Sequence, residues 1–337
     1  MRIVALLPII FFPLVAALGH GQQRNLEPVR VSYPSVTGNM APLWIAREMR
    51  LFERYGLEAR LVNIASGVIS VNALISGEIQ LAAASSSSAV TAAAQGAPVV
   101  IIATFGPTPY KLVAHPSITS IDALRGKIIG SSRPGAGSDY ALRRLLPKLG
   151  LAPGRDVTIL PTGLSEADKR ILTVLQGKID ATIGTLDSIS QFELRGQKLS
   201  VLADLLEMGV HTSGSVLATT RQYLRDHRRQ TKAFLSAFCE AIWLGRKDKE
   251  VAFQIYRKNL RIQDPSLLGV IYKTSLLDRI PPKPYPQEEA IQFDLESMST
   301  SNPEFTEKLK GRKPADFIDS SILQELERED FFTRLQR

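Results

Sequence analysis

Short polar segments rich in small and hydroxyl-bearing residues are the part of this sequence best suited to bind a small molecule. They span residues 32–39, 65–67, 84–88, 131–138, 162–163 and 184–187. Most lie between an expected strand and an expected helix, where unpaired N–H groups and the helix dipole favour an anion or a polar group. Ser and Thr there also serve as plain N-caps, so one loop alone is ambiguous. Several such loops at the carboxyl ends of strands predict a ligand site.

Several side chains within or beside these loops have chemistry that suits a ligand. Arg133 could form a bidentate hydrogen bond with a carboxylate, sulfonate or phosphate, or it could point into solvent. Tyr33 and Trp44 offer flat apolar walls, although Trp44 could instead pack against the sheet. Asp187 could bind an amine or cap the next helix. The candidate ligand-binding residues are Tyr33, Ser35, Asn39, Trp44, Gly67, Ser85, Ser86, Arg133, Gly135, Ser138, Thr162, Thr185 and Asp187.

The sequence lacks the short motifs that mark nucleotide-binding, hydrolytic and metal-dependent enzymes. Residues 134–138 resemble a phosphate loop but lack its G-K-[ST] ending, and no G-x-S-x-G elbow occurs. The 4 His residues form no H-E-x-x-H motif. Cys239 is the single Cys, which excludes an internal disulfide or a multi-Cys metal site. We therefore expect a non-enzymatic protein with no catalytic residue, no metal and no cofactor.

The chain of 337 residues is basic, with 41 Lys and Arg against 33 Asp and Glu and a net charge of +8. Its hydrophobic content of 44% is that of an ordinary globular protein. The densest basic cluster, within residues 221–232, lies in an amphipathic pattern that favours a solvated helix face over a nucleic-acid site. We expect no nucleic-acid partner.

Strand and helix patterns alternate along most of the chain. Strands are expected at 29–33, 57–64, 79–83, 99–104, 127–130, 157–160, 179–183 and 216–219. Helices are expected at 41–52, 68–75, 89–95, 139–149 and 169–175, and helical periodicity dominates from residue 221. This alternation predicts mainly parallel sheets covered by helices on both faces.

The pattern restarts near residue 122, which predicts two lobes. Lobe I comprises residues 27–105 and 216–337, lobe II comprises 110–205, and the chain crosses between them near 105–111 and 204–215. Residues 1–21 read as a signal peptide, with a positive start, an apolar run and small residues before a polar stretch. An uncleaved N-terminal anchor is the alternative. We expect an exported, periplasmic protein that is a monomer.

Several segments resemble those of a known family. Residues 39–48 (NMAPLWIARE) and 51–58 (LFERYGLE) are similar to the opening of periplasmic substrate-binding proteins of the nitrate/sulfonate/taurine type. Residues 73–79, 122–127, 177–181 and 283–286 match as well, in the same order. The family shares a superfamily with the thiamine-pyrimidine synthase domain of fungi.

The resemblance implies an α/β, type II periplasmic-binding-protein fold, with two doubly wound lobes joined by two crossover segments and C-terminal helices packed on the first lobe. It implies a small-molecule ligand, delivered to the membrane permease of an ABC importer, that contacts the loop after the first strand, Ser85–Ser86 and residues 131–138. We expect a small polar or anionic organic ligand. The alternatives are an exported ligand-sensing domain and a synthase-like enzyme, although the synthase branch carries a Cys-rich segment that a chain with only Cys239 cannot match.

Overall fold

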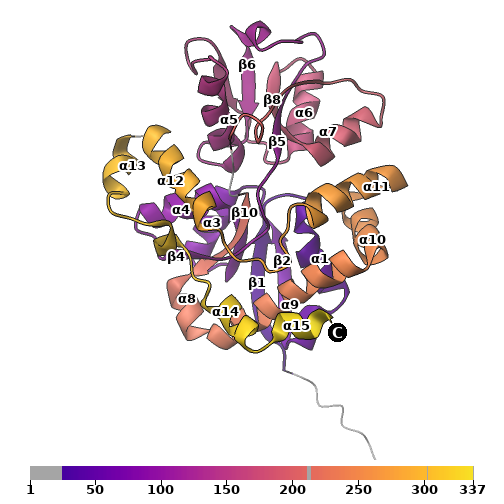
Figure 1. The fold of residues 1–337 in the computed structure, drawn as a ribbon, viewed down its shortest axis with the longest axis vertical. Coiled ribbons are helices and arrows are strands. Elements are labelled where there is room, and N and C mark those ends of the chain that lie inside the picture. The colour runs from indigo at the N-terminus through magenta and orange to yellow at the C-terminus, as the bar shows by residue number, and fades with distance from the viewer. Residues whose placement is uncertain (1–24, 211–213, 302, 337) are drawn as a thin grey trace, which may run out of the picture.

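The strands assemble into two separate sheets of five strands each, one in each lobe (Figure 1). The computed structural model describes residues 25–210, 214–301 and 303–336, so the predicted signal peptide lies outside them. In lobe I the strand order is β2-β1-β3-β10-β4. The strands are β1 (Glu27–Tyr33), β2 (Leu57–Asn63), β3 (Leu81–Ser85), β4 (Val99–Thr104) and β10 (Ser215–Thr220).

The sheet of lobe II has the order β7-β6-β8-β5-β9. Its strands are β5 (Tyr110–Ala114), β6 (Ile128–Ser131), β7 (Thr158–Pro161), β8 (Ala181–Thr185) and β9 (Ser200–Asp204). Two of them, β5 and β9, were missing from the sequence prediction, and each adjoins a segment that was predicted to be a crossover between the lobes. The start of β5 also falls within the segment that was predicted to be a crossover.

Each sheet contains one strand that runs against its neighbours. β10 is antiparallel to β3 and β4, and β5 is antiparallel to β8 and β9. Each of these strands is the first that the chain forms after crossing from the other lobe. The other strand pairs, β1–β2, β1–β3, β6–β7 and β6–β8, are parallel. The prediction of mainly parallel sheets is therefore confirmed for these pairs only.

Helices cover both sheets. Those within the first part of lobe I are α1 (Ala41–Glu48), α2 (Leu51–Arg54), α3 (Gly67–Ile75) and α4 (Ser86–Ala94), and those of lobe II are α5 (Gly137–Lys148), α6 (Ala167–Leu175) and α7 (Leu186–Glu193). The C-terminal helices are α8 (Arg221–Asp226), α9 (Arg228–Lys247), α10 (Lys249–Leu260), α11 (Pro265–Ile271), α12 (Glu288–Ser301), α13 (Pro303–Lys308), α14 (Ser321–Arg328) and α15 (Phe331–Gln336). Short turns of other helix types are η1 (Gly38–Met40), η2 (Asp122–Leu124), η3 (Tyr272–Leu277) and η4 (Pro314–Phe317).

The C-terminal helices pack on lobe I, as predicted. Phe52 of α2 stacks on Phe234 of α9 with ring centroids 5.1 Å apart, and both belong to the main hydrophobic core. Trp44 of α1 lies in the same core and is 1% exposed. The apolar face of α9 therefore replaces water over the helices of lobe I, which is the dominant stabilising contribution of such packing.

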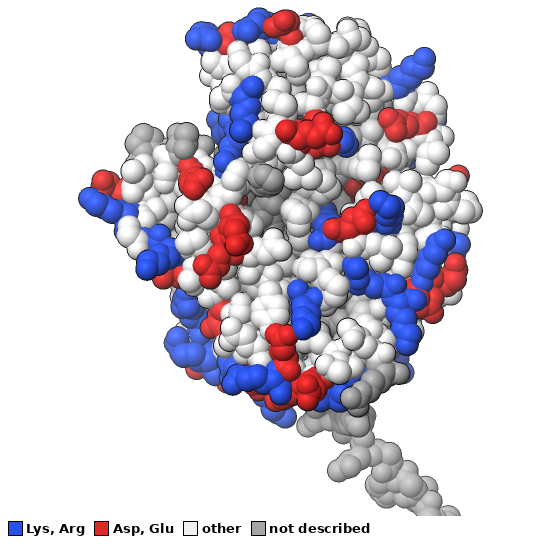
Figure 2. Space-filling view, viewed as in Figure 1, with Lys and Arg blue, Asp and Glu red and all other residues white. Residues whose placement is uncertain are grey.

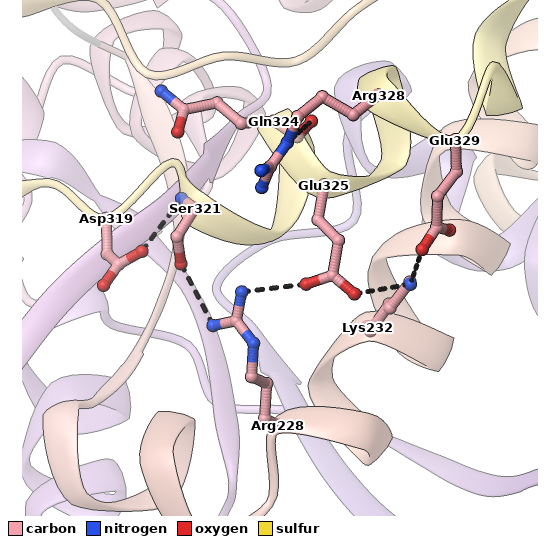
Figure 3. A network of polar contacts seen from close by, with 8 residues as sticks. All are labelled: Arg228, Lys232, Asp319, Ser321, Gln324, Glu325, Arg328 and Glu329. Atoms are coloured by element: carbon pink, nitrogen blue, oxygen red, sulfur yellow. Dashed lines mark hydrogen bonds and ion pairs between the residues drawn. The ribbon is translucent and has the colours of Figure 1, made fainter.

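The basic cluster that the sequence placed on a helix holds the chain's last helices in place (Figure 3). Arg228 of α9 donates to Glu325 of α14 at 2.9 Å and to Ser321 at 3.1 Å. Lys232 of α9 contacts both Glu325 and Glu329 at 2.6 Å. These cations are thus paired with carboxylates, and Lys and Arg lie interleaved with Asp and Glu over the face seen in Figure 2.

None of the helices in the part of the chain that the structure describes is long and apolar enough to cross a membrane.

Candidate functional site

A cavity of about 110 Å³ lies between the two lobes, and most of the residues that line it carry a hydroxyl group. The serines that line it from lobe I are Ser35, Ser85, Ser86, Ser87 and Ser215, and those from lobe II are Ser132, Ser138 and Ser165. Thr108, Tyr110 and Tyr140 add further hydroxyls, and Ser297 comes from α12. Hydroxyls both donate and accept hydrogen bonds, so these walls suit a small polar molecule.

Three helices begin at this cavity. Gly67 is the first residue of α3, Ser86 of α4 and Gly137 of α5, and all three line the cavity. Ser85 caps α4, because its side chain accepts a hydrogen bond from the backbone N–H of Ser88. Helix N-termini carry a partial positive charge and unpaired N–H groups, so their convergence favours an anionic or strongly polar ligand group.

Among the described residues, two charged side chains lie in the cavity wall, and both come from helices rather than from strand-end loops. Arg144 of α5 places its guanidinium 3.2 Å from the ring centroid of Phe293 in α12 and donates through Nη1 to the Phe293 carbonyl at 2.7 Å and to Ser297 Oγ. Burial lowers the pKa of Arg144 from its usual value. Asp294 accepts a hydrogen bond from Ser86 Oγ at 2.5 Å. Arg144 can therefore offer its remaining donors to an acidic group.

The lobes touch each other around the cavity, so the structure is in a closed arrangement. Ser88 Oγ lies 3.5 Å from the carbonyl oxygen of Gly135, and Thr91 Oγ1 lies 3.4 Å from the hydroxyl of Tyr140. Ser165 Oγ also donates to the carbonyl of Ala65. A molecule held in this space contacts both lobes at once.

Some of the residues predicted from the sequence line the cavity. They are Ser35, Gly67, Ser85, Ser86 and Ser138. Two others lie beside it. The carbonyl of Gly135 faces Ser88 across the lobe boundary, and Asn39 is buried and donates from Nδ2 to Ser215 Oγ at 3.4 Å.

The remaining predicted residues lie away from the cavity lining. Tyr33 and Trp44 make an edge-to-face pair with centroids 6.1 Å apart, with Trp44 in the core of lobe I. Arg133 is exposed and does not line the cavity. Thr162 donates to the Ser131 carbonyl at 2.8 Å, whereas Thr185 donates to Ser188 at 2.9 Å. Asp187 is buried in the first turn of α7.

Sequence reasoning missed Arg144, Asp294, Tyr110 and Tyr140, which line the cavity. Tyr140 and Arg144 are four residues apart on α5 and so share one helix face, a spacing visible in the sequence. The residues of this helix face do not indicate which element it packs against. Asp294 lies on a C-terminal helix far along the chain, and no local pattern connects it to the strand-end loops.

Buried Arg170 of α6 holds the loop that carries Ser165. Its Nη1 donates to the carbonyls of Leu164 and Ser165, each at 2.8 Å. Its Nε donates to Thr182 at 3.2 Å and its Nη2 to the carbonyl of Ile183 at 3.0 Å. These bonds satisfy a guanidinium that is only 1% exposed and fix the Ser165 loop against the sheet.

Within residues 25–210, 214–301 and 303–336, no group of His, Cys, Asp and Glu residues is arranged to hold a metal ion. The profile of the family described as NMT1/THI5 like matches residues 37–245. The chain belongs to the NMT1/THI5-like family. The match begins after β1 and ends within the last turn of α9, so it includes all of lobe II and leaves out the helices that follow α9.

One curated relative of this family member is a protein of Haemophilus influenzae whose name refers to thiamine biosynthesis. It is 24% identical over 211 residues, which are 61% of this chain and 65% of the relative. This chain thus spans 65% of the length of the curated relative that it matches.

Solved structures share the fold over nearly the whole chain. A protein of Bordetella bronchiseptica RB50 superimposes with a TM-score of 0.75 at 18% identity, covering 90% of this chain and 98% of that one. The periplasmic aliphatic sulphonate binding protein SsuA of Escherichia coli gives 0.66 at 20%, covering 87% and 92%. The periplasmic nitrate-binding protein NrtA of Synechocystis PCC 6803 gives 0.65 at 14%, covering 90% and 89%. The predicted periplasmic-binding-protein fold is confirmed.

Proposed function

We propose that this NMT1/THI5-like protein is an extracytoplasmic solute-binding protein that captures a small polar or anionic organic molecule between its lobes and delivers it to an ABC importer. The observation that carries the proposal is the cavity between the lobes, which is lined by hydroxyls, by the starts of three helices and by Arg144. The names of SsuA and NrtA, which refer to binding of sulphonate and of nitrate, support it. In this proposal the captured molecule leaves the site chemically unchanged.

Binding and lobe closure are coupled in this proposal. The free protein samples an open state, and a ligand that contacts both lobes stabilises the closed state by the difference between its affinities for the two. Micromolar affinity corresponds to about 8 kcal/mol. Hydrogen bonds to the hydroxyls and helix N-termini, together with one charge-assisted bond to Arg144, are of the right order to supply it.

The organisation of the chain forms part of the proposal. Residues 1–21 act as an export signal, residues 27–105 and 216–337 form one lobe, and residues 110–205 form the other. The protein acts as a periplasmic monomer, and the permease recognises its closed state. Cell fractionation tests the location, and the mass of the purified protein in solution tests the monomer.

The binding site is tested by a thermal-shift screen of small carboxylates, sulfonates, amines and heterocycles, followed by calorimetry with the strongest hit. For an anionic hit, Arg144→Met should weaken binding at least about tenfold, or ~1.4 kcal/mol. The matched control is Arg133→Met, because Arg133 lies in a neighbouring loop but is exposed. Equal losses in the two variants, or no loss in either, would remove Arg144 from the site.

Delivery to an importer is tested in cells of the source organism. Deleting the gene should abolish uptake of the radiolabelled hit, and restoring it should restore uptake. Uptake that is unchanged, together with loss of a transcriptional response to the hit, would point instead to a ligand-sensing domain.

A further inference from the structure

A second cavity lies next to the one between the lobes, and its lining has a different character. Its volume is about 330 Å³, and most of the residues that line it are apolar, among them Pro107 of the first crossover, Leu206 beyond β9 and Val216 of β10. We call it the apolar cavity, and the hydroxyl-lined cavity of the candidate site the polar cavity. Among the described residues, Phe293 of α12 is the one that lines both. The two cavities therefore meet at Phe293.

Phe293 is half-buried, and contacts with both lobes fix its position. Its neighbours on α12, Ile291 and Leu295, belong to a hydrophobic core of lobe I, and α12 contacts both α4 of lobe I and α5 of lobe II (Figure 1). The Phe293 ring itself packs against the core of lobe II and lies under the Arg144 guanidinium, which is 3.2 Å from the ring centroid. A cation over the face of an aromatic ring is attracted to it, so this contact favours one orientation of the ring.

The position of the ring limits the space that a ligand can use. The polar cavity measures about 110 Å³ and has Phe293 in its wall. A ligand whose polar group is held by the hydroxyls has no room for an alkyl chain in the direction of Phe293. Without the ring, such a chain extends into the apolar cavity, where burial of its surface is favourable. Each buried methylene group corresponds to roughly a fourfold gain in affinity.

We propose that Phe293 sets the upper limit on ligand size, because its ring separates the polar cavity from the apolar cavity. The inference rests on the proposed function, since it assigns a specificity-determining residue to the same site. A compact polar molecule fits within the limit. The same polar group with a long straight chain meets the ring and is rejected, whatever the charge of that polar group.

The test measures the binding of three pairs of probes by calorimetry: methanesulfonate and hexanesulfonate, methylamine and hexylamine, and methanol and hexanol. The pairs provide a negative, a positive and an uncharged polar group. Wild type should bind no hexyl compound more tightly than its methyl partner. Phe293→Ala should bind the hexyl compound of at least one pair at least about tenfold more tightly than wild type does. A wild type that prefers a hexyl compound, or a Phe293→Ala variant that gains affinity in none of the three pairs, would overturn the inference.

The control variants separate the loss of the ring from a general gain of apolar space. Phe293→Ala keeps the backbone carbonyl and the Ser297 hydroxyl to which Arg144 donates, so Arg144 stays attached to α12. The matched control is Leu206→Ala, because Leu206 lines the apolar cavity only. This variant enlarges that cavity while the ring stays in place, and it should bind the hexyl compounds no better than wild type. An equal gain in Leu206→Ala contradicts the role assigned to Phe293. Phe293→Leu removes less of the side chain and should show a smaller gain, and its result decides the test if urea unfolding shows that Phe293→Ala is not folded.

A crystal structure of Phe293→Ala with the hexyl compound that it binds shows where the chain lies. We expect the chain beside Pro107 and Val216, and a chain bound anywhere else would refute the separation of the cavities by Phe293. Failure of the proposed function has a different signature. In that case deletion of the gene leaves uptake of the hit from the wider screen unchanged, while the size limit measured on the purified protein still holds.

Discussion

Gly137 offers a way to block lobe closure without disturbing either lobe. It is the first residue of α5 in lobe II, and it faces Ser85 of lobe I. A Cβ added at Gly137 would lie 3.3 Å from the Ser85 Cβ and 3.7 Å from the hydroxyl of Tyr110. Carbon atoms in favourable contact are about 3.5–4.0 Å apart. Gly137→Val therefore places two further methyl groups at a boundary that is already full when the lobes are closed.

The expected size of the effect follows from the cost of overpacking, which is typically about 1–3 kcal/mol. Because Gly137 and Ser85 belong to different lobes, their crowding exists only in the closed state, and its cost appears in the free energy of ligand binding. Affinity for the strongest hit of the screen should fall roughly 5- to 150-fold. Stability should stay within about 0.5 kcal/mol of wild type, since valine has a slightly better helix propensity than glycine.

Calorimetry gives the affinity, urea unfolding gives the stability, and small-angle scattering with saturating ligand gives the degree of closure. The matched control is Gly269→Val on α11, where an added Cβ meets nothing within 4 Å. That variant should bind ligand as wild type does. If Gly137→Val loses affinity yet still closes fully around ligand, the valine occludes the cavity and does not hold the lobes apart, which would refute the steric role assigned to this position.

Three further predictions concern the groups that hold the site and the C-terminal helices. Arg144→Lys keeps the charge but loses the planar fork, so affinity for an anionic hit should fall between that of wild type and that of Arg144→Met. Arg170→Met leaves buried carbonyls of the Ser165 loop without a hydrogen-bond donor, and urea unfolding should show that the free energy of unfolding falls by at least about 2 kcal/mol. The pKa of Glu325 is lowered from 4.5 because Lys232 and Arg228 donate hydrogen bonds to its carboxylate. Its contribution to stability is therefore present above about pH 4.5 and is lost as the pH falls through the lowered pKa. The difference in thermal midpoint between wild type and Glu325→Gln should accordingly be largest near neutral pH and vanish in acid; a difference that persists in acid would contradict this assignment.

Much of the local structure was predictable from sequence because its causes are local. Hydrophobic runs bounded by glycine and polar caps marked most strands and helices of both lobes. The polar loop at residues 84–88 was predicted to precede a helix at 89–95, whereas in the structure α4 already begins at Ser86 and is capped by Ser85. The prediction failed for β5 and β9, whose pairing depends on strands far away in the chain.

The candidate site shows the same division. Ser35, Gly67, Ser85, Ser86 and Ser138 were found because they stand at strand ends, which an α/β sheet gathers at one edge. That rule gives the position of a loop but not the direction in which each side chain points. Arg133 lies in a strand-end loop but is exposed, whereas Arg144 lies on the following helix and lines the cavity. The position of the loop does not predict either orientation.

The sequence by itself thus determined the elements, their alternation in two lobes and the hydroxyl-rich character of the loops, because capping, periodicity and composition act between near neighbours. Only the tertiary structure decided that α12 brings Asp294 to the cavity and that Gly137 meets Ser85. Each of these depends on contacts between segments more than 50 residues apart. Such contacts are set by how the whole chain buries its apolar surface, and no window of the sequence contains that information.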